Sequence, residues 1–320
     1  MTGSRTKYHK IWENISLPSN NSFEAYKDAA SKNIVSVFDL WWNQDKLIPF
    51  QSFLNNSDHW AEHTHNVYKK SLEIAQTIEN TENISIDPYL LFVMSSMHDS
   101  WRFRLSIPKT DDTEKQIQAK QKKRTVAERK HNEFGVAQIN LAVKKLKEKW
   151  ISIDPDQVEK IKDYIFNHDF FSTRLDWIKY KEPTSIEGQV VRLADRVSVT
   201  VEEEIVRYRE TGKRLNTRYF NDQISFEERV NFTFENMWNY IKTWKFDEFT
   251  FFLALLSMSP DDFENKTLKK IYSERSINKQ DGINKILKIA EEESYTPENI
   301  KSMKKLITDY LFYFNIKIWE

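Results

Sequence analysis

Apolar residues recur along most of this chain at intervals of three and four, the spacing of one face of an α-helix. Ser71, Ile74, Ala75 and Ile78 share such a face and predict a helix over roughly residues 58–79. The same spacing predicts helices over about 127–149, from Pro155 to His168, and from about Ile186 past Val197. Because only 5 glycines and 8 prolines interrupt 320 residues, we expect an all-α fold in which strands are incidental.

Capping signals predict where several of these helices begin. Four places combine a short polar side chain with a following proline, which suits the cap and the first helical position: Asp87-Pro88, Asp154-Pro155, Ser259-Pro260 and Thr296-Pro297. The helix that starts at Pro88 contains the apolar run LLFVM and ends in MHDSWRF, so it delivers His98 and Asp99 at its C-terminal end.

Composition limits the chemistry. Lys plus Arg and Asp plus Glu both total 48, so no global field draws the chain to nucleic acid or to an acidic membrane surface. Without cysteine, the strong metal ligands that remain are His, Asp and Glu. The N-terminal segment lacks the apolar core of a signal peptide and no run is long enough to span a membrane, so we expect a cytoplasmic protein.

The histidines follow the helices. Five of the 7 lie near predicted helix ends, roughly one per helix: His59, His63, His98, His131 and His168. Antiparallel helices of a bundle can bring one or two such ligands each to a common centre. Asp195 lies among apolar residues in VVRLADRVSV, where a cation would remove the cost of burying its charge. An ion pair with Arg192 or Arg196 is the alternative.

The order of His63 in HTHNV, His98-Asp99 in MHDSWR and Asp195 in LADRV resembles the H…HD…D signature of the HD-domain superfamily of metal-dependent phosphohydrolases. The resemblance covers roughly residues 57–210 and implies an HD-domain-like helical bundle. It assigns the first ligand to His63 and not to His65, because His63 lies four residues before a valine, as in that family.

Two further segments resemble binuclear members of the superfamily, KHNEFGVAQI around His131 and IFNHDF around His168. The implied ligands are His63, His98, Asp99 and Asp195 for one divalent cation and His131, His168 and a bridging Asp99 for a second. Manganese, iron, magnesium, nickel and cobalt all suit this set. The GYP motif is absent after His168, so the resemblance does not extend to cyclic-di-GMP specificity.

The resemblance also implies roles in catalysis. Two cations held close together can bind a phosphate oxygen, activate water and stabilise the charge that develops during in-line attack. Asp99 would bridge the cations and orient the water, and Arg102 is our candidate for a phosphate contact. The basic stretch around 115–130 is a weaker candidate, since charge runs are usually solvated. For His59 a third-metal role is conceivable, but packing is the preferred interpretation.

We therefore expect residues 57–210 to be the catalytic core, with an N-terminal helical extension (1–56) and a helical C-terminal region (211–320) packed on the core. The expected activity is that of a phosphomonoesterase or phosphodiesterase on a nucleotide or another small phosphorylated substrate. A diiron oxygenase of the same fold uses a similar ligand set and is one alternative. A non-catalytic regulatory module stabilised by metal is another.

Overall fold

A computed structural model of the chain describes residues 16–38, 61–98, 113–148, 153–168, 181–198 and 263–275, with isolated residues between 284 and 308. The side chains of residues 120–131 are not among those described. The described part is helical and contains no strand, which confirms the prediction of an all-α fold. No helix in these ranges is both long and apolar enough to cross a membrane.

The chain divides into two compact units. Unit 1 comprises Met1–Arg104, Arg129–Val199 and Pro260–Glu274, and unit 2 comprises Leu105–Glu128, Thr200–Ser259 and Arg275–Glu320. Most described residues belong to unit 1. The domain boundaries expected at residues 57 and 210 fall in parts of the chain that lie outside the described residues, so that division stays a prediction.

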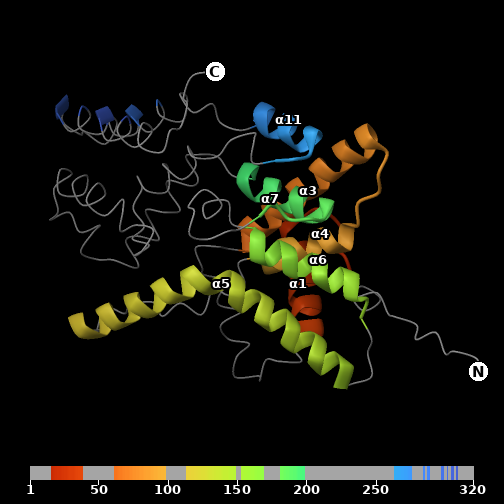
Figure 1. The fold of residues 1–320 in the computed structure, drawn as a ribbon, viewed down its shortest axis with the longest axis horizontal. Helices are drawn as coiled ribbons and strands as arrows, with labels where there is room; N and C mark the ends of the chain where they lie inside the picture. Colours follow the sequence, from red (N-terminus) through yellow and green to blue (C-terminus); the bar gives the residue numbers. More distant parts are fainter. Residues whose placement is uncertain are drawn as a thin grey trace, which may run out of the picture. The chain divides into compact units, whose positions relative to one another are not determined.

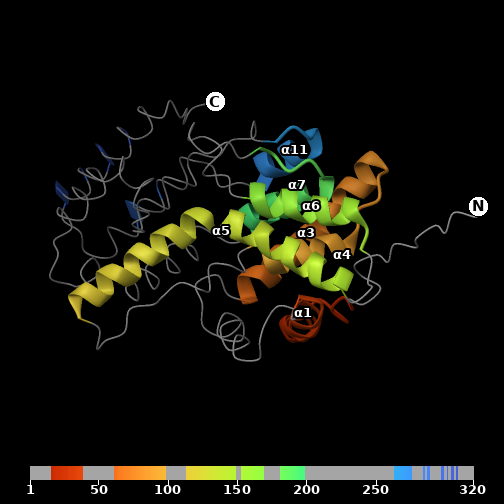
Figure 2. The ribbon, with the colours of Figure 1, turned by 60° about the horizontal axis from the view of Figure 1, so that its bottom comes forward.

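Unit 1 is a group of packed helices (Figure 1). Its elements are α1 (Phe23–Phe38), α3 (Ala61–Glu82), α4 (Pro88–Met97), α6 (Pro155–Asn167), α7 (Ile186–Val197) and α11 (Lys266–Arg275), together with the part of α5 (Glu114–Glu148) that follows Glu128. Helices α3, α4, α6 and α7 pack on one another, and α1 covers α3 and α4. In Figure 2, α1 and α11 lie at opposite ends of this stack.

Helix α4 is the centre of the packing. All of its residues from Leu90 to Met97 are buried, and it contacts α1, α3, α6 and α7. A short helix that is apolar on every side belongs inside a protein, because no face of it would gain from contact with water. Around it, the predicted stripe of α3 is buried, as are Val190, Val191 and Ala194 of α7.

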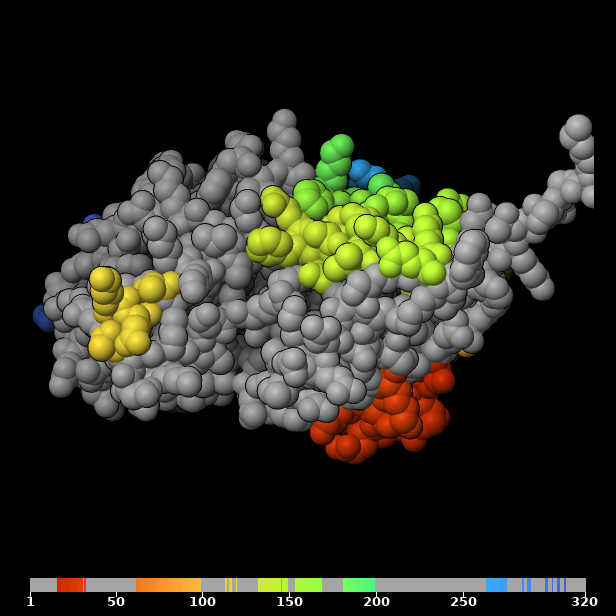
Figure 3. All heavy atoms as spheres, turned by 90° about the horizontal axis from the view of Figure 1, so that it is seen from below, coloured from red at the N-terminus to blue at the C-terminus, as the bar shows by residue number. Residues whose placement is uncertain are grey.

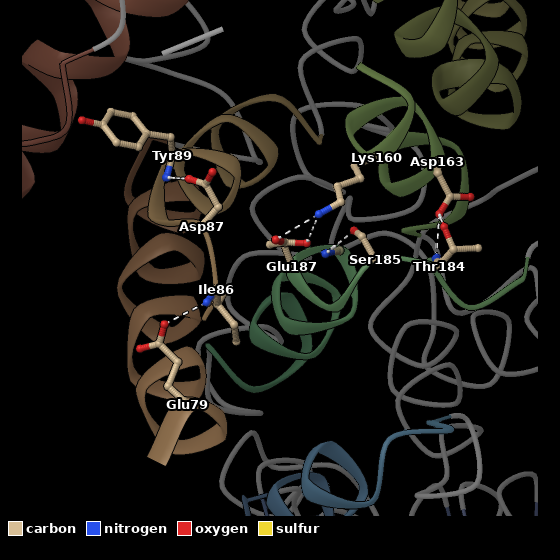
Figure 4. Close-up of polar contacts among 10 residues, drawn as sticks. Glu79, Ile86, Asp87, Tyr89, Lys160, Asp163, Thr184, Ser185 and Glu187 are labelled. Atoms are coloured by element: carbon tan, nitrogen blue, oxygen red, sulfur yellow. Dashed lines mark hydrogen bonds and ion pairs between the residues drawn. The ribbon is translucent and has the colours of Figure 1, made fainter. Parts of the chain in front are cut away.

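The predicted caps at Asp87 and Asp154 are confirmed. Asp87 Oδ1 accepts a hydrogen bond from the Tyr89 amide at 2.9 Å, and Asp154 Oδ1 accepts one from the Asp156 amide at 3.0 Å. Figure 4 shows the first of these caps and the corresponding bond at Ser185, which caps α7. The starts proposed at Ser259 and Thr296 lie outside the described residues.

Helix α5 differs from its predicted extent. It begins at Glu114, thirteen residues before the expected start at about residue 127. The stretch 114–126 is rich in Lys and Gln, which favour helix, but it lacks the apolar stripe on which the prediction relied. Farther along α5 the predicted stripe does hold, since Ile139, Ala142 and Leu146 are buried.

Candidate metal site

Three of the predicted ligands converge in unit 1. One nitrogen of His63, one nitrogen of His98 and one carboxylate oxygen of Asp195 all lie within 4.8 Å of one another. They come from α3, from the end of α4 and from α7, three helices that pack together. The side chains are only 6%, 2% and 9% exposed. Residues up to 132 positions apart in sequence thus share one buried spot.

His63 lies on the inner face of α3, one turn before the buried Val67. Its Nε2 is 3.0 Å from Asp195 Oδ1, a hydrogen-bond distance. A neutral imidazole can donate this hydrogen bond. To bind a cation through the same nitrogen, His63 must give up that proton, so metal binding and the hydrogen bond exclude each other.

His98 caps the C-terminus of α4, and its backbone N–H donates to Met94 O. Its Nδ1 lies 2.8 Å from Ser95 O. A carbonyl oxygen only accepts, so Nδ1 carries the proton and Nε2 of the neutral ring holds the lone pair. Nε2 is the atom that points toward Asp195, 3.7 Å from Oδ1. This backbone contact sets the tautomer that a metal ligand needs.

Asp195 combines burial with positive neighbours. Burial by itself would raise the pKa of its carboxyl. The Arg196 guanidinium, the hydrogen bond from His63 and the electrostatic attraction of the His98 and His63 rings outweigh burial, and the pKa of this carboxyl lies well below its ordinary value of 3.8. Arg196 Nε is 3.7 Å from Asp195 Oδ2, so the ion pair with Arg196 and the histidine contacts are present together.

His168 lies beside this trio. It caps the C-terminus of α6, is 2% exposed, and has its ring centroid 5.6 Å from that of His98. Its Nδ1 is 2.7 Å from Ile165 O, so Nε2 again holds the lone pair of the neutral ring. In both His98 and His168, therefore, a hydrogen bond from Nδ1 to the carbonyl three residues earlier fixes the ring. Among the described residues, His168 is not one of those whose ligand atoms all lie within 4.8 Å of one another.

The remaining predicted site residues are not described. Asp99, Arg102 and His59 lie outside the described residues, as does the side chain of His131, although its backbone belongs to α5. Their roles as bridging ligand, phosphate contact, packed residue and ligand stay predictions. His65, in contrast, packs against α1, with ring centroids 5.7 Å from Phe23 and 5.2 Å from Tyr26.

Sequence reasoning missed the residue that connects the site to α1. Tyr26 is 1% exposed, and its hydroxyl lies 2.9 Å from Ser96 Oγ and also bonds the Thr64 side chain. Thr64 follows His63, and Ser96 lies two residues before His98. The only signal available in the sequence was an aromatic residue in a segment whose apolar pattern is weak.

The donor set fits a divalent cation. Two imidazoles and one carboxylate are ligands that manganese, iron, nickel, cobalt and zinc accept, and burial excludes competing water. The carboxylate supplies one negative charge, so a bound divalent cation would leave the trio with one net positive charge. Such a charge can attract an anionic ligand.

Comparisons with models of known protein families, with curated proteins and with solved structures gave no match.

Proposed function

We propose that this chain is a metal-dependent phosphohydrolase of the HD-domain type that acts on a small phosphorylated substrate. The observation that carries the proposal is the convergence of His63, His98 and Asp195 in one buried group. These three residues occur in the order that the H…HD…D resemblance requires. The neighbouring ring of His168 supports a second cation position beside the first.

The predicted ligands would form two cation positions. His63, His98 and Asp195 would hold the first cation, and His168, with His131 and Asp99, would hold the second. When bound, such a pair of cations supplies Lewis acidity toward a phosphate oxygen and lowers the pKa of water toward neutrality. The protein's part is to keep two imidazoles in the right tautomer and one carboxylate ionised.

The geometry supports both of those tasks. The Ser95 and Ile165 carbonyls fix the tautomers of His98 and His168. The neighbouring Arg196 and the two imidazoles keep the pKa of Asp195 low, so its carboxylate is ionised at neutral pH. Arg196 is 21% exposed at its side chain, and its positive charge favours the ionised form of Asp195.

Assays of phosphate-ester hydrolysis with defined metals test the proposal. Purified protein, stripped with chelator and reloaded with Mn²⁺ in oxygen-free buffer, should hydrolyse an aryl phosphate or bis-aryl phosphate ester or a nucleotide. His98→Ala should abolish the turnover. Asp28→Asn, at an exposed aspartate on α1, is the control and should keep it. Oxygen uptake by the iron-loaded protein without any phosphate release would instead support the oxygenase alternative.

A further inference from the structure

The C-terminal end of α6 is held by side-chain donors. The last carbonyls of a helix lack intrahelical partners and need donors from elsewhere. In α6, Ile165 O accepts from His168 Nδ1 at 2.7 Å, and Phe166 O accepts from Asn132 Nδ2 at 2.8 Å. The second donor comes from α5, so this bond links α5 to the C-terminal end of α6, just before His168.

Asn132 is almost completely buried, at 1% exposure. The orientation of its amide is unambiguous, because only its nitrogen can donate to a carbonyl. Its Oδ1 has no hydrogen-bond partner within the described ranges. Burying an unpaired amide oxygen is costly, and this cost offsets part of what the hydrogen bond to Phe166 O contributes to stability. Asn132 lies in the same turn of α5 as His131, and Phe166 lies two residues before His168.

Helix α6 is also hydrogen-bonded to the segment before α7, and these bonds do not involve Asn132. Asp163 Oδ2 accepts hydrogen bonds from the Thr184 amide at 2.6 Å and from the Thr184 hydroxyl at 2.9 Å, as Figure 4 shows. Asn167 Oδ1 accepts from the Lys181 amide at 2.9 Å. These bonds join α6 to the segment that leads into α7. Removing the Asn132 amide would therefore remove this bond between α6 and α5 and leave the connection of α6 toward α7, the helix of Asp195, in place.

We infer that Asn132 is a positioning residue for the second cation, because it fixes the end of α6 that presents His168. In Figure 3 the later described residues of α5, in yellow-green, lie beside those of α6, as this contact requires. The inference rests on the proposed function, since it presupposes that His168 is a ligand. It assigns Asn132 to the second cation position alone, because His63, His98 and Asp195 come from α3, α4 and α7.

The test is a titration of the metal-free protein with Mn²⁺, with bound metal measured by equilibrium dialysis and metal analysis. Wild-type protein should bind two ions. Asn132→Asp and Asn132→Leu should bind the first ion with a dissociation constant within about 3-fold of the wild type, and the second about 10–100-fold more weakly, the usual cost of losing a partner that orients a ligand. Asn140→Asp, at an exposed asparagine on α5, is the control and should match the wild type.

The outcomes separate this inference from the proposed function. The inference would be overturned if the dissociation constant of the second ion were unchanged in both Asn132 variants, or if both ions bound more weakly by the same factor. Either result would leave the proposed function standing. Failure of both variants to fold without metal would assign Asn132 to the stability of the fold and would also overturn it. A wild-type protein that binds no ion would contradict the proposed function and, with it, the inference.

Discussion

Replacement of Asp195 by asparagine should remove the stabilisation that metal confers on the protein. The carboxylate is 9% exposed and faces His63 at 3.0 Å, His98 at 3.7 Å and Arg196 at 3.7 Å. An asparagine oxygen can still accept the hydrogen bond from His63. We therefore expect the metal-free variant to lose only about 1 kcal/mol of stability, the usual net worth of weakening one such bond.

The effect of metal should be much larger. A ligand present at 100 times its dissociation constant stabilises the folded state by about 2.7 kcal/mol. For a unit of this size each kcal/mol raises Tm by about 2–4 °C, so Mn²⁺ should raise the Tm of the wild type by about 5–10 °C. If Asp195→Asn weakens binding about 100-fold, the same Mn²⁺ concentration adds only about 0.4 kcal/mol. The shift should then fall to about 1–2 °C.

The assay is scanning calorimetry with Mn²⁺ or with chelator, for the wild type, Asp195→Asn and Asp28→Asn. Asp28 is exposed and pairs with Lys32 on the surface of α1, so its variant makes the same chemical change far from any buried charge. It should keep the whole Tm shift. The same Tm shift in Asp195→Asn as in the wild type would refute the reasoning, because Asp195 would then not be a ligand.

Three further predictions concern the fold. Asp154→Ala removes the cap of α6 and should cost about 1 kcal/mol in urea unfolding, and an unchanged midpoint would contradict the cap assignment. Gly188→Ala should destabilise the protein by about 1–3 kcal/mol, because the added Cβ would lie 2.8 Å from Pro183 Cβ. This loss is expected although alanine favours helix. Greater stability of the variant in thermal unfolding would show that the contact relaxes. Burial raises the pKa of Tyr68 to about 12 from its ordinary 10.0, so its neutral form adds stability below pH 10 that is lost as the pH rises through 12. Tyr68→Phe should reduce this alkaline loss in pH-dependent unfolding, and an identical pH dependence would contradict it.

Sequence patterns were a good guide wherever the structure follows local rules. Asp87-Pro88 and Asp154-Pro155 start helices because a cap and a fixed proline φ act within one turn. The apolar stripes of α3 and α7 predicted their buried faces. The early start of α5 escaped prediction because helix propensity without an apolar stripe leaves no periodic signal.

The site was predictable in kind but not in geometry. An aspartate among apolar residues in LADRV and histidines at helix ends were visible in the sequence, and the structure brings His63, His98 and Asp195 together. The carbonyls of Ser95 and Ile165, which set the ring tautomers, are invisible there because any residue has a carbonyl. The contact from Asn132 to Phe166 O depends on how α5 meets α6, and no pattern within one helix encodes it.

The central claim is that His63, His98 and Asp195 together bind a divalent cation. Anomalous X-ray diffraction at the manganese edge, from crystals of protein loaded with Mn²⁺, tests it most directly because it locates the ion itself. We predict an anomalous peak in contact with the Nε2 atoms of His63 and His98 and with the carboxylate of Asp195. Crystals soaked at saturating Mn²⁺ in which this position has no peak, with His63 still hydrogen-bonded to Asp195, would contradict the claim.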